Sequence, residues 1–258
     1  EYIQPLKPKL KQISLTVPKK MVAELHPADL AEIMSRVSKE EAAQLIKDLD
    51  VETAAEAISE LAPEMQAKII TEIDADKAAD IIEEMTPDDA VDMLSDLPVE
   101  KAKEILEKVE KEEAEDINEL LSHEEDSAGG LMTTELISYQ PHITVKDAIE
   151  LFKKDAGDVE TVYYLYMVDN EEKLIGVISL RELLLADPEK RLAEIMETKI
   201  IKVTPNEDVE VVAELMSKYD LVAIPVVDDK GLLLGIVTVD DIMDVVKEEA
   251  TDDIYKLA

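Results

Sequence analysis

The chain of 258 residues contains no cysteine, which excludes disulfides, thiolate zinc sites, iron–sulfur clusters and cysteine nucleophiles. Basic residues are scarce, since 27 Lys and Arg stand against 62 Asp and Glu and leave a formal net charge of −35 at pH 7. Phosphate binding needs a basic face that releases counterions, so nucleic acid is not expected as a partner. The same acidic excess disfavours binding to an anionic membrane surface.

Long apolar runs and targeting signals are also missing from the sequence. No stretch of about 18 apolar residues occurs, so no segment is expected to span a bilayer. No basic segment followed by an apolar stretch marks a secretory signal. The first residue is Glu1 and a helical pattern still continues at Ala258, which predicts that the sequence is a piece of a longer protein.

A repeat of twelve residues fills the first half of the chain. From Pro27 to Ser122 the sequence divides without a gap into eight blocks, such as PEMQAKIITEID and PDDAVDMLSDLP. Positions 4, 7, 8 and 11 of the blocks are mostly apolar, a spacing that forms one stripe along a helix of about nine residues. Helices of this length are not stable alone in water, so the blocks are predicted to stack into a right-handed superhelix.

After the glycine pair Gly129–Gly130, the pattern changes to a duplicated β-α-β unit. The first copy is predicted to contain a helix with Val145, Ala148, Leu151 and Phe152 on its apolar face, strands over 161–169 and 173–179, and a helix over 180–185. A second copy repeats this order, with Met196 matching Met132 and Gly235 matching Gly176. The fold class is therefore α plus α/β: a short-helix, right-handed superhelical domain followed by two β-α-β units.

The order of these parts, with the segments EEDSAGGLMT (124–133) and VTVDDIMDVVKEEATDDIYKLA (237–258), resembles the cytosolic region of MgtE-family magnesium channels. In that family a superhelical domain precedes a tandem pair of CBS domains. The resemblance implies an N-terminal arm, a superhelical domain, two CBS domains and the start of a connecting (plug) helix, over 1–25, 26–128, 129–188, 189–250 and 251–258.

The resemblance also implies a function. The fragment is expected to be soluble and to form a homodimer through its CBS domains at the cytoplasmic face of the inner or plasma membrane. Its other partner is expected to be the protein's own transmembrane pore domain, which this sequence does not contain. The family binds Mg²⁺ in its cytosolic domains and closes the pore when intracellular Mg²⁺ is high, so the expected role is Mg²⁺ sensing.

Magnesium is held through a few carboxylates and retained waters, so a site needs acids facing acids rather than a rigid motif. The resemblance implies metal-binding roles for twelve acids: Glu56, Asp88, Asp92, Asp208, Glu210, Asp220, Asp240, Asp241, Asp244, Glu249, Asp252 and Asp253. Asp88 and Asp92 are four residues apart and lie on one helix face. Any one of these acids is also compatible with the solvated face of a helical array.

Adenine-nucleotide binding is an alternative function, because many CBS pairs bind ATP or a related ligand in the cleft between copies. Such sites use a Ser or Thr after the second strand and an Asp three residues later. Thr238 and Asp241 fit this pattern in the second copy, but Asp241 cannot serve nucleotide and magnesium at once. Possible ATP is therefore expected on the first copy, with contacts from Tyr164, Arg181 and Glu182.

Two further interpretations are less supported by the residues. A passive acidic scaffold would bind a protein partner through the concave superhelix and would not change shape with Mg²⁺. Catalysis is not predicted, because His26, His123 and His142 lie far apart in the sequence and form no HExxH pattern.

Overall fold

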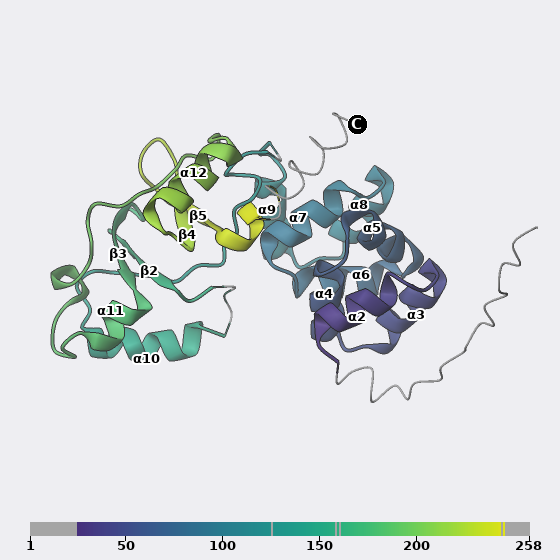
Figure 1. Ribbon diagram of the computed structural model, residues 1–258, viewed down its shortest axis with the longest axis horizontal. Helices are drawn as coiled ribbons and strands as arrows, with labels where there is room; N and C mark the ends of the chain where they lie inside the picture. Colours follow the sequence, from purple (N-terminus) through teal and green to yellow (C-terminus); the bar gives the residue numbers. More distant parts are fainter. Residues whose placement is uncertain (1–24, 125, 158, 160, 244, 246–258) are drawn as a thin grey trace, which may run out of the picture.

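The computed structural model describes residues 25–124, 126–157, 159, 161–243 and 245 (Figure 1). Within that part of the chain, eight helices precede residue 122: α2 (Pro27–Met34), α3 (Lys39–Asp48), α4 (Val51–Ser59), α5 (Pro63–Glu72), α6 (Ala75–Glu83), α7 (Pro87–Ser95), α8 (Val99–Leu106) and α9 (Lys111–Leu120). Each begins at the first position of a twelve-residue block, so the repeat predicted where these helices start. None of the described helices is long and apolar enough to cross a membrane.

Local signals in the sequence explain where these helices begin. Proline occupies the first helical position of α2, α5 and α7, where its missing N–H costs no hydrogen bond. The side chains of Ser38, Asp50 and Asp74 cap α3, α4 and α6 by accepting hydrogen bonds from backbone N–H groups three residues later. His26 caps α2 through Nδ1, so this histidine has a structural role.

Each helix of the superhelix packs against the helix two places further along the chain, from α2 on α4 to α7 on α9. Ala42, Ala54 and Ala78 at position 4 of their blocks are fully buried and let neighbouring helices approach closely. Position 7 is buried from Ala57 onward, whereas Ile33 in the first block is 41% exposed. The exposure of Ile33 follows from its place on the first described helix, which packs only against helices that come after it.

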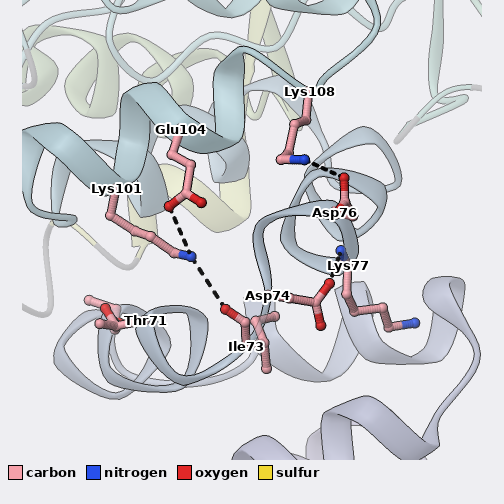
Figure 2. Close-up of polar contacts among 9 residues, drawn as sticks. Thr71, Ile73, Asp74, Asp76, Lys77, Lys101, Glu104 and Lys108 are labelled. Atoms are coloured by element: carbon pink, nitrogen blue, oxygen red, sulfur yellow. Dashed lines mark hydrogen bonds and ion pairs between the residues drawn. The ribbon is translucent and has the colours of Figure 1, made fainter.

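Lysine side chains form hydrogen bonds between successive layers of the superhelix. Lys77 Nζ donates to the carbonyl oxygen of Leu49 at 3.4 Å, and Lys101 Nζ donates to that of Ile73 at 3.3 Å. Figure 2 shows Lys101 reaching Ile73 at the end of α5, where a cation also complements the negative end of the helix dipole. Both lysines occupy position 3 of their blocks, so this position makes the same cross-layer contact in the two blocks where it is lysine.

The two β-α-β copies form two small sheets, as the sequence predicted. The first copy contains β1 (Ser138–Tyr139), α10 (Val145–Asp155), β2 (Tyr164–Val168), β3 (Leu174–Ser179) and α11 (Leu180–Leu185), and, after the 3₁₀ turn η1 (Leu192–Glu194), the second contains α12 (Val209–Tyr219), β4 (Ala223–Val227) and β5 (Leu233–Thr238). β1 runs parallel to β2, and the pairs β2–β3 and β4–β5 are antiparallel. The strand predicted from residue 161 begins only at Tyr164, and Leu151 lies at the edge of the buried face of α10 with 38% exposed.

The segments that lead into the two copies exchange partners. Thr133, before the first copy, pairs with Ile236 of β5, with N–H···O distances of 2.9 and 3.0 Å. Glu197, before the second copy, pairs in the same way with Val177 of β3. Each sheet is therefore extended by a segment that belongs to the other repeat.

This exchange explains the glycines and methionines that matched in the sequence. A Cβ atom on Gly176 would lie 2.5 Å from Met196 Sδ, and one on Gly235 would lie 2.6 Å from the carbonyl oxygen of Thr133 and 3.1 Å from Met132 Sδ. The Thr133 carbonyl oxygen belongs to the backbone, so Gly235 needs glycine for the close approach of the exchanged segment, whereas a side chain at position 176 would displace the Met196 side chain.

Buried apolar side chains form three clusters. The largest runs from the superhelix through Ala128 and Leu131 into the second copy, where it includes Val212. A separate cluster around Leu165 fills the first copy, and a third lies between the two sheets around Tyr166. The superhelix therefore shares its core with the second copy and not with the first.

Candidate functional site

A cleft of about 1020 Å³ lies where the superhelix meets the second copy, at the junction near α7 and the end of β5 in Figure 1. Five predicted metal ligands line it: Glu56 from α4, Asp88 and Asp92 from α7, and Asp240 and Asp241 after β5. Three more carboxylates, those of Glu60, Asp89 and Asp96, join them, and the described lining residues include no lysine or arginine. The fold thus gathers acids from two distant parts of the chain around one space.

Helix α7 presents its acids near its start. Pro87 opens the helix, and Asp88 and Asp89 follow in the first turn, where the positive end of the helix dipole favours carboxylates. Asp88 is buried, with 7% exposed, whereas Asp92 is exposed one turn later. The helix therefore offers the cleft one deep and one solvated carboxylate from the predicted pair.

Asp89 was not among the predicted ligands. Burial raises the pKa of Asp89 and the nearby Asp240 carboxylate raises it further, whereas the hydroxyls of Ser59 and Thr86 act in the opposite direction. Asp89 occupies position 3 of its block, the position that is lysine in the blocks on either side. Position 3 is acidic in four of the eight blocks, so the sequence alone does not single out Asp89.

At the end of α4, a glutamine takes the place of the lysine that donates to the carbonyl oxygen at the ends of α3 and α5. Gln66 Nε2 donates to the carbonyl oxygens of Ser59 at 3.3 Å and Leu61 at 2.9 Å. A neutral amide therefore caps α4, whereas Lys101 caps the corresponding end of α5, one block further along the chain (Figure 2). As a result, the superhelix brings no cation to this side of the cleft among its described residues.

The second copy contributes two adjacent carboxylates held by one hydroxyl. Thr238, which is 2% exposed, lies with Oγ1 at 2.6 Å from Asp240 Oδ1 and also within hydrogen-bond distance of Asp241. A hydroxyl has one proton to donate, so it serves one carboxylate at a time. Burial raises the pKa of Asp241 to about 6, and the carboxylates of Asp240 and Asp89 add to this rise. The ionised carboxylates of the cleft therefore repel one another.

Three predicted ligands lie elsewhere, on α12. Asp208 is the N-cap of this helix and accepts a hydrogen bond from the backbone N–H of Glu210 at 2.9 Å. Asp220 ends the helix in the left-handed conformation, with φ of 52°. Glu210 and Asp220 line a second groove of about 1110 Å³, which also includes exposed apolar side chains such as Met243. These acids do not converge with those of the cleft.

No group of three or more His, Asp or Glu side chains in the described part of the chain is arranged to hold a metal ion directly. Four predicted ligands, Asp244, Glu249, Asp252 and Asp253, lie outside the described residues. In the acidic cleft, carboxylates of the superhelix therefore line one space with carboxylates of the second copy, without forming a preformed metal coordination shell.

The residues predicted to contact a nucleotide do not line the cleft or the second groove. Ser179 and Glu182 form a capping box at the start of α11, in which the Glu182 carboxylate accepts from the backbone N–H of Ser179 at 3.0 Å and from its hydroxyl at 2.7 Å. Arg181 is exposed, and Tyr164 is half-buried between the sheets. A third hollow of about 390 Å³, near Gln140, is lined by none of them.

Comparison with known proteins identifies the relatives of this architecture. Residues 25–126 match the MgtE intracellular N domain, and residues 128–189 and 192–248 match the CBS domain. The crystal structure of the soluble part of a magnesium transporter superposes with a TM-score of 0.85 at 36% identity, covering 90% of this chain and 91% of that one. The chain belongs to the MgtE family.

A second MgtE structure, that of the cytosolic domain of the Mg²⁺ channel MgtE in complex with ATP, gives a TM-score of 0.84 at 37% identity over 88% of this chain and 93% of that one. Among curated proteins, magnesium transporter MgtE of Thermus thermophilus is 49% identical over 141 residues, and that of Bacillus subtilis is 43% identical over 139 residues. These matches cover 55% and 54% of this chain and 31% of each relative. The chain thus matches less than a third of the length of these MgtE relatives, which are transporters rather than enzymes.

Proposed function

We propose that this chain is the Mg²⁺-sensing regulatory region of a magnesium channel or transporter at the cytoplasmic face of the cell membrane. In this proposal Mg²⁺ bound between the superhelix and the second CBS copy stabilises the closed state of a transmembrane pore domain. The observation that carries the proposal is the acidic cleft, in which Asp88 and Asp92 of α7 share one space with Asp240 and Asp241. Its MgtE relatives are described as magnesium transporters, which supports Mg²⁺ as the ion.

The gathering of carboxylates around one cleft is compatible with the chemistry of this ion. Mg²⁺ is octahedral, loses its waters reluctantly, and is bound by proteins through one or two carboxylates with waters filling the other positions. A cleft of separated acids can therefore hold it through water without a direct three-ligand cluster. Carboxylates about 4 Å apart repel by roughly 1 to 4 kcal/mol, depending on the local dielectric, so metal removal favours separation of the two sides.

Several weak sites are needed to make such a sensor steep. A site that exists only in the closed state contributes about 1.4 kcal/mol when free Mg²⁺ is ten times its Kd. Changing a two-state ratio from 1:99 to 99:1 needs about 5.5 kcal/mol, or roughly four such sites. The proposed positions outside the cleft supply the additional sites: Asp208, Glu210, Asp220, Asp244, Glu249, Asp252 and Asp253.

The groove along α12 supports the proposed homodimer. Val211 of α12 is 39% exposed, and Met243, which lines the same groove, is 53% exposed. Apolar side chains gathered on one helix face favour burial against another protein surface. We propose a second copy of this chain as the partner, which would also bring Glu210 and Asp220 near their counterparts.

ATP is a second proposed ligand, because an MgtE relative at 37% identity was solved in complex with ATP. We assign the contacts to Tyr164, Arg181 and Glu182 of the first CBS copy. The capping box of Glu182 leaves Arg181 exposed beside it, where a guanidinium can meet phosphates. Nucleotide at this place would leave Asp241 to the metal.

Small-angle scattering with a Mg²⁺ titration tests the proposed function. From zero to about 20 mM Mg²⁺, an excess over the weak affinities of sparse carboxylate sites, the radius of gyration is expected to fall. Potassium chloride at matched ionic strength is the control, because any salt screens the charge of −35. A radius that responds equally to both salts, or to neither, contradicts Mg²⁺ sensing and leaves the acidic scaffold as the better account.

A further inference from the structure

The connection between the superhelix and the CBS pair is built into the second CBS copy. We call residues 126–133 the connector. The backbone N–H of Ala128 donates to Glu207 O at 2.8 Å, and that of Gly129 donates to Pro205 O at 2.8 Å. Residues 127–132 are all buried, so the glycine pair that marks a boundary in the sequence is not an exposed linker in the structure.

The other end of the connector belongs to the second copy as well. Thr133 exchanges two backbone hydrogen bonds with Ile236 of β5, and Gly235 lets the two segments approach closely. At the start of the connector, the backbone N–H of Val209 points to Asp126 O at 3.4 Å, which joins the connector to the N-terminus of α12. The connector thus contacts both α12 and β5, whose ends carry the groove and the acidic cleft.

The junction between α9 and the connector has a different character. Residues 121–124 are all at least partly exposed, and they follow the last turn of α9. The imidazole of His123 lies against Gly129, where an added Cβ would be 2.7 Å from Cγ of the ring and 3.0 Å from Pro205 Cβ. This ring is therefore a contact between the end of the superhelix and the connector.

We propose that residues 121–124 are the pivot on which the superhelix moves relative to the CBS pair, and that the His123 ring seated on Gly129 latches the arrangement seen here. The connector moves as part of the second copy. Movement of the superhelix then acts directly on α12 and β5, and reaches the first copy only through them. The trigger for this movement rests on the proposed function, whereas the place of the pivot rests on the contacts above.

Amide hydrogen exchange of the whole chain, with and without 20 mM Mg²⁺, tests the place of the pivot. The amides of Ala128, Gly129 and Thr133 are expected to stay as protected as Ile236 under both conditions, because their bonds lie within the second copy. The backbone N–H groups of Leu121, Ser122 and His123 donate to carbonyl oxygens in the last turns of α9, at an exposed helix end, so they are expected to exchange several-fold faster than the buried connector under both conditions. Exchange of the connector at the rate of residues 121–124 overturns the proposal.

Two variants test the latch. Gly129→Ala places a methyl group against the His123 ring and is expected to speed exchange at residues 121–124 several-fold, whereas Gly157→Ala, with no atom within 4 Å of the new group, is the matched control. His123→Ala removes the ring without adding an atom, and is expected to speed the same amides while Thr133 stays protected.

The two latch variants are also expected to be non-additive. In the His123→Ala background, Gly129→Ala should add little, because the atom that it meets is gone. The latch is overturned if the amides of residues 121–124 exchange at the wild-type rate in His123→Ala. It is also overturned if they exchange at the same rate in Gly129→Ala as in Gly157→Ala. These comparisons do not require a response to Mg²⁺, so a chain that ignores Mg²⁺ counts against the proposed function and not against the pivot.

Discussion

The two CBS copies share one fold but use matched positions differently. In the first copy, Ser179 and Glu182 bond to each other and cap α11. In the second, Thr238 and Asp241 occupy the matching positions, and Asp241 lines the acidic cleft beside Asp240. The first copy has a core of its own, whereas the core of the second is continuous with that of the superhelix.

The difference shows that duplication fixed the backbone and left the matched side chains available for other roles. A carboxylate three residues after a hydroxyl residue is a helix cap when solvent lies in front of it. The same arrangement becomes part of a charged cleft when another domain is packed against it. Placement next to the superhelix, more than the motif itself, therefore distinguishes the copy that lines the acidic cleft from the copy that does not.

The largest expected effect comes from matched cavities in the two cores. Leu165 and Ile224 occupy equivalent positions in β2 and β4, and both are fully buried. Leu165→Ala and Ile224→Ala should each lower the free energy of unfolding by about 2–5 kcal/mol. Only Ile224→Ala should also raise the Mg²⁺ midpoint of compaction, because its cluster includes the superhelix. Urea unfolding measures the free energy of unfolding, and small-angle scattering measures the Mg²⁺ midpoint. Equal shifts of the Mg²⁺ midpoint in the two variants would contradict the expected difference between the two copies.

A smaller effect is expected from a single ligand on the superhelix. Asp88→Ala removes a buried carboxylate from the cleft and should cost the closed state about 1–2 kcal/mol, a several-fold rise in the Mg²⁺ midpoint. CBS dimerisation should be unchanged, since α12 lies elsewhere. Asp80→Ala, on the exposed face of α6, is the control. If Asp80→Ala raises the Mg²⁺ midpoint as much as Asp88→Ala does, the cleft has no specific role in the response to Mg²⁺.

The smallest effect separates the matched acids Asp241 and Glu182. The pKa of Asp241 in the folded chain, about 6, lies above the ordinary value of about 3.9. The native state therefore binds more protons than the unfolded state, and the free energy of unfolding should fall as pH rises from about 4 to about 6. Asp241→Asn should flatten this decline in urea unfolding without Mg²⁺.

Glu182→Gln is the matched control for the titration of Asp241. Glutamine can still accept the hydrogen bond from the backbone N–H of Ser179, so only the favourable charge at the start of α11 is lost, and stability should fall by about 0.3–1 kcal/mol. The decline between pH 4 and 6 and the Mg²⁺ midpoint should both remain as in the wild type. A pH profile that Asp241→Asn leaves unchanged would show that another group titrates in this range.

The superhelix was readable from the sequence because its signals are local. Prolines, capping side chains and a strict apolar period lie within each block, and every helix of the described superhelix begins where its block begins. The exposed Ile33 was not foreseen, since the repeat describes interior blocks and not the end of an array. Five of the twelve acids implied by family resemblance do meet in one cleft.

The rest depended on contacts between distant segments, which no local pattern encodes. Asp89 looked like one more surface acid, and only packing against Ser59 and the second copy makes it half-buried. The glycine pair Gly129–Gly130 signals a break in the pattern, but the hydrogen bonds from Gly129 to Pro205 and from Ala128 to Glu207 make this segment part of a sheet-bearing domain.

The exchange of leading segments between the two copies also constrains how the chain folds during synthesis. The helices of the superhelix contact neighbours two places away, so they can assemble as they emerge. The first copy cannot complete its sheet until Glu197 is available to pair with Val177, and the connector has no partner for Thr133 until Ile236 has been made. A nascent chain with one copy therefore carries open strand edges, which favour pairing with other chains. The two CBS copies consequently form a single folding unit, and the first cannot be obtained as a well-behaved fragment by cutting between them.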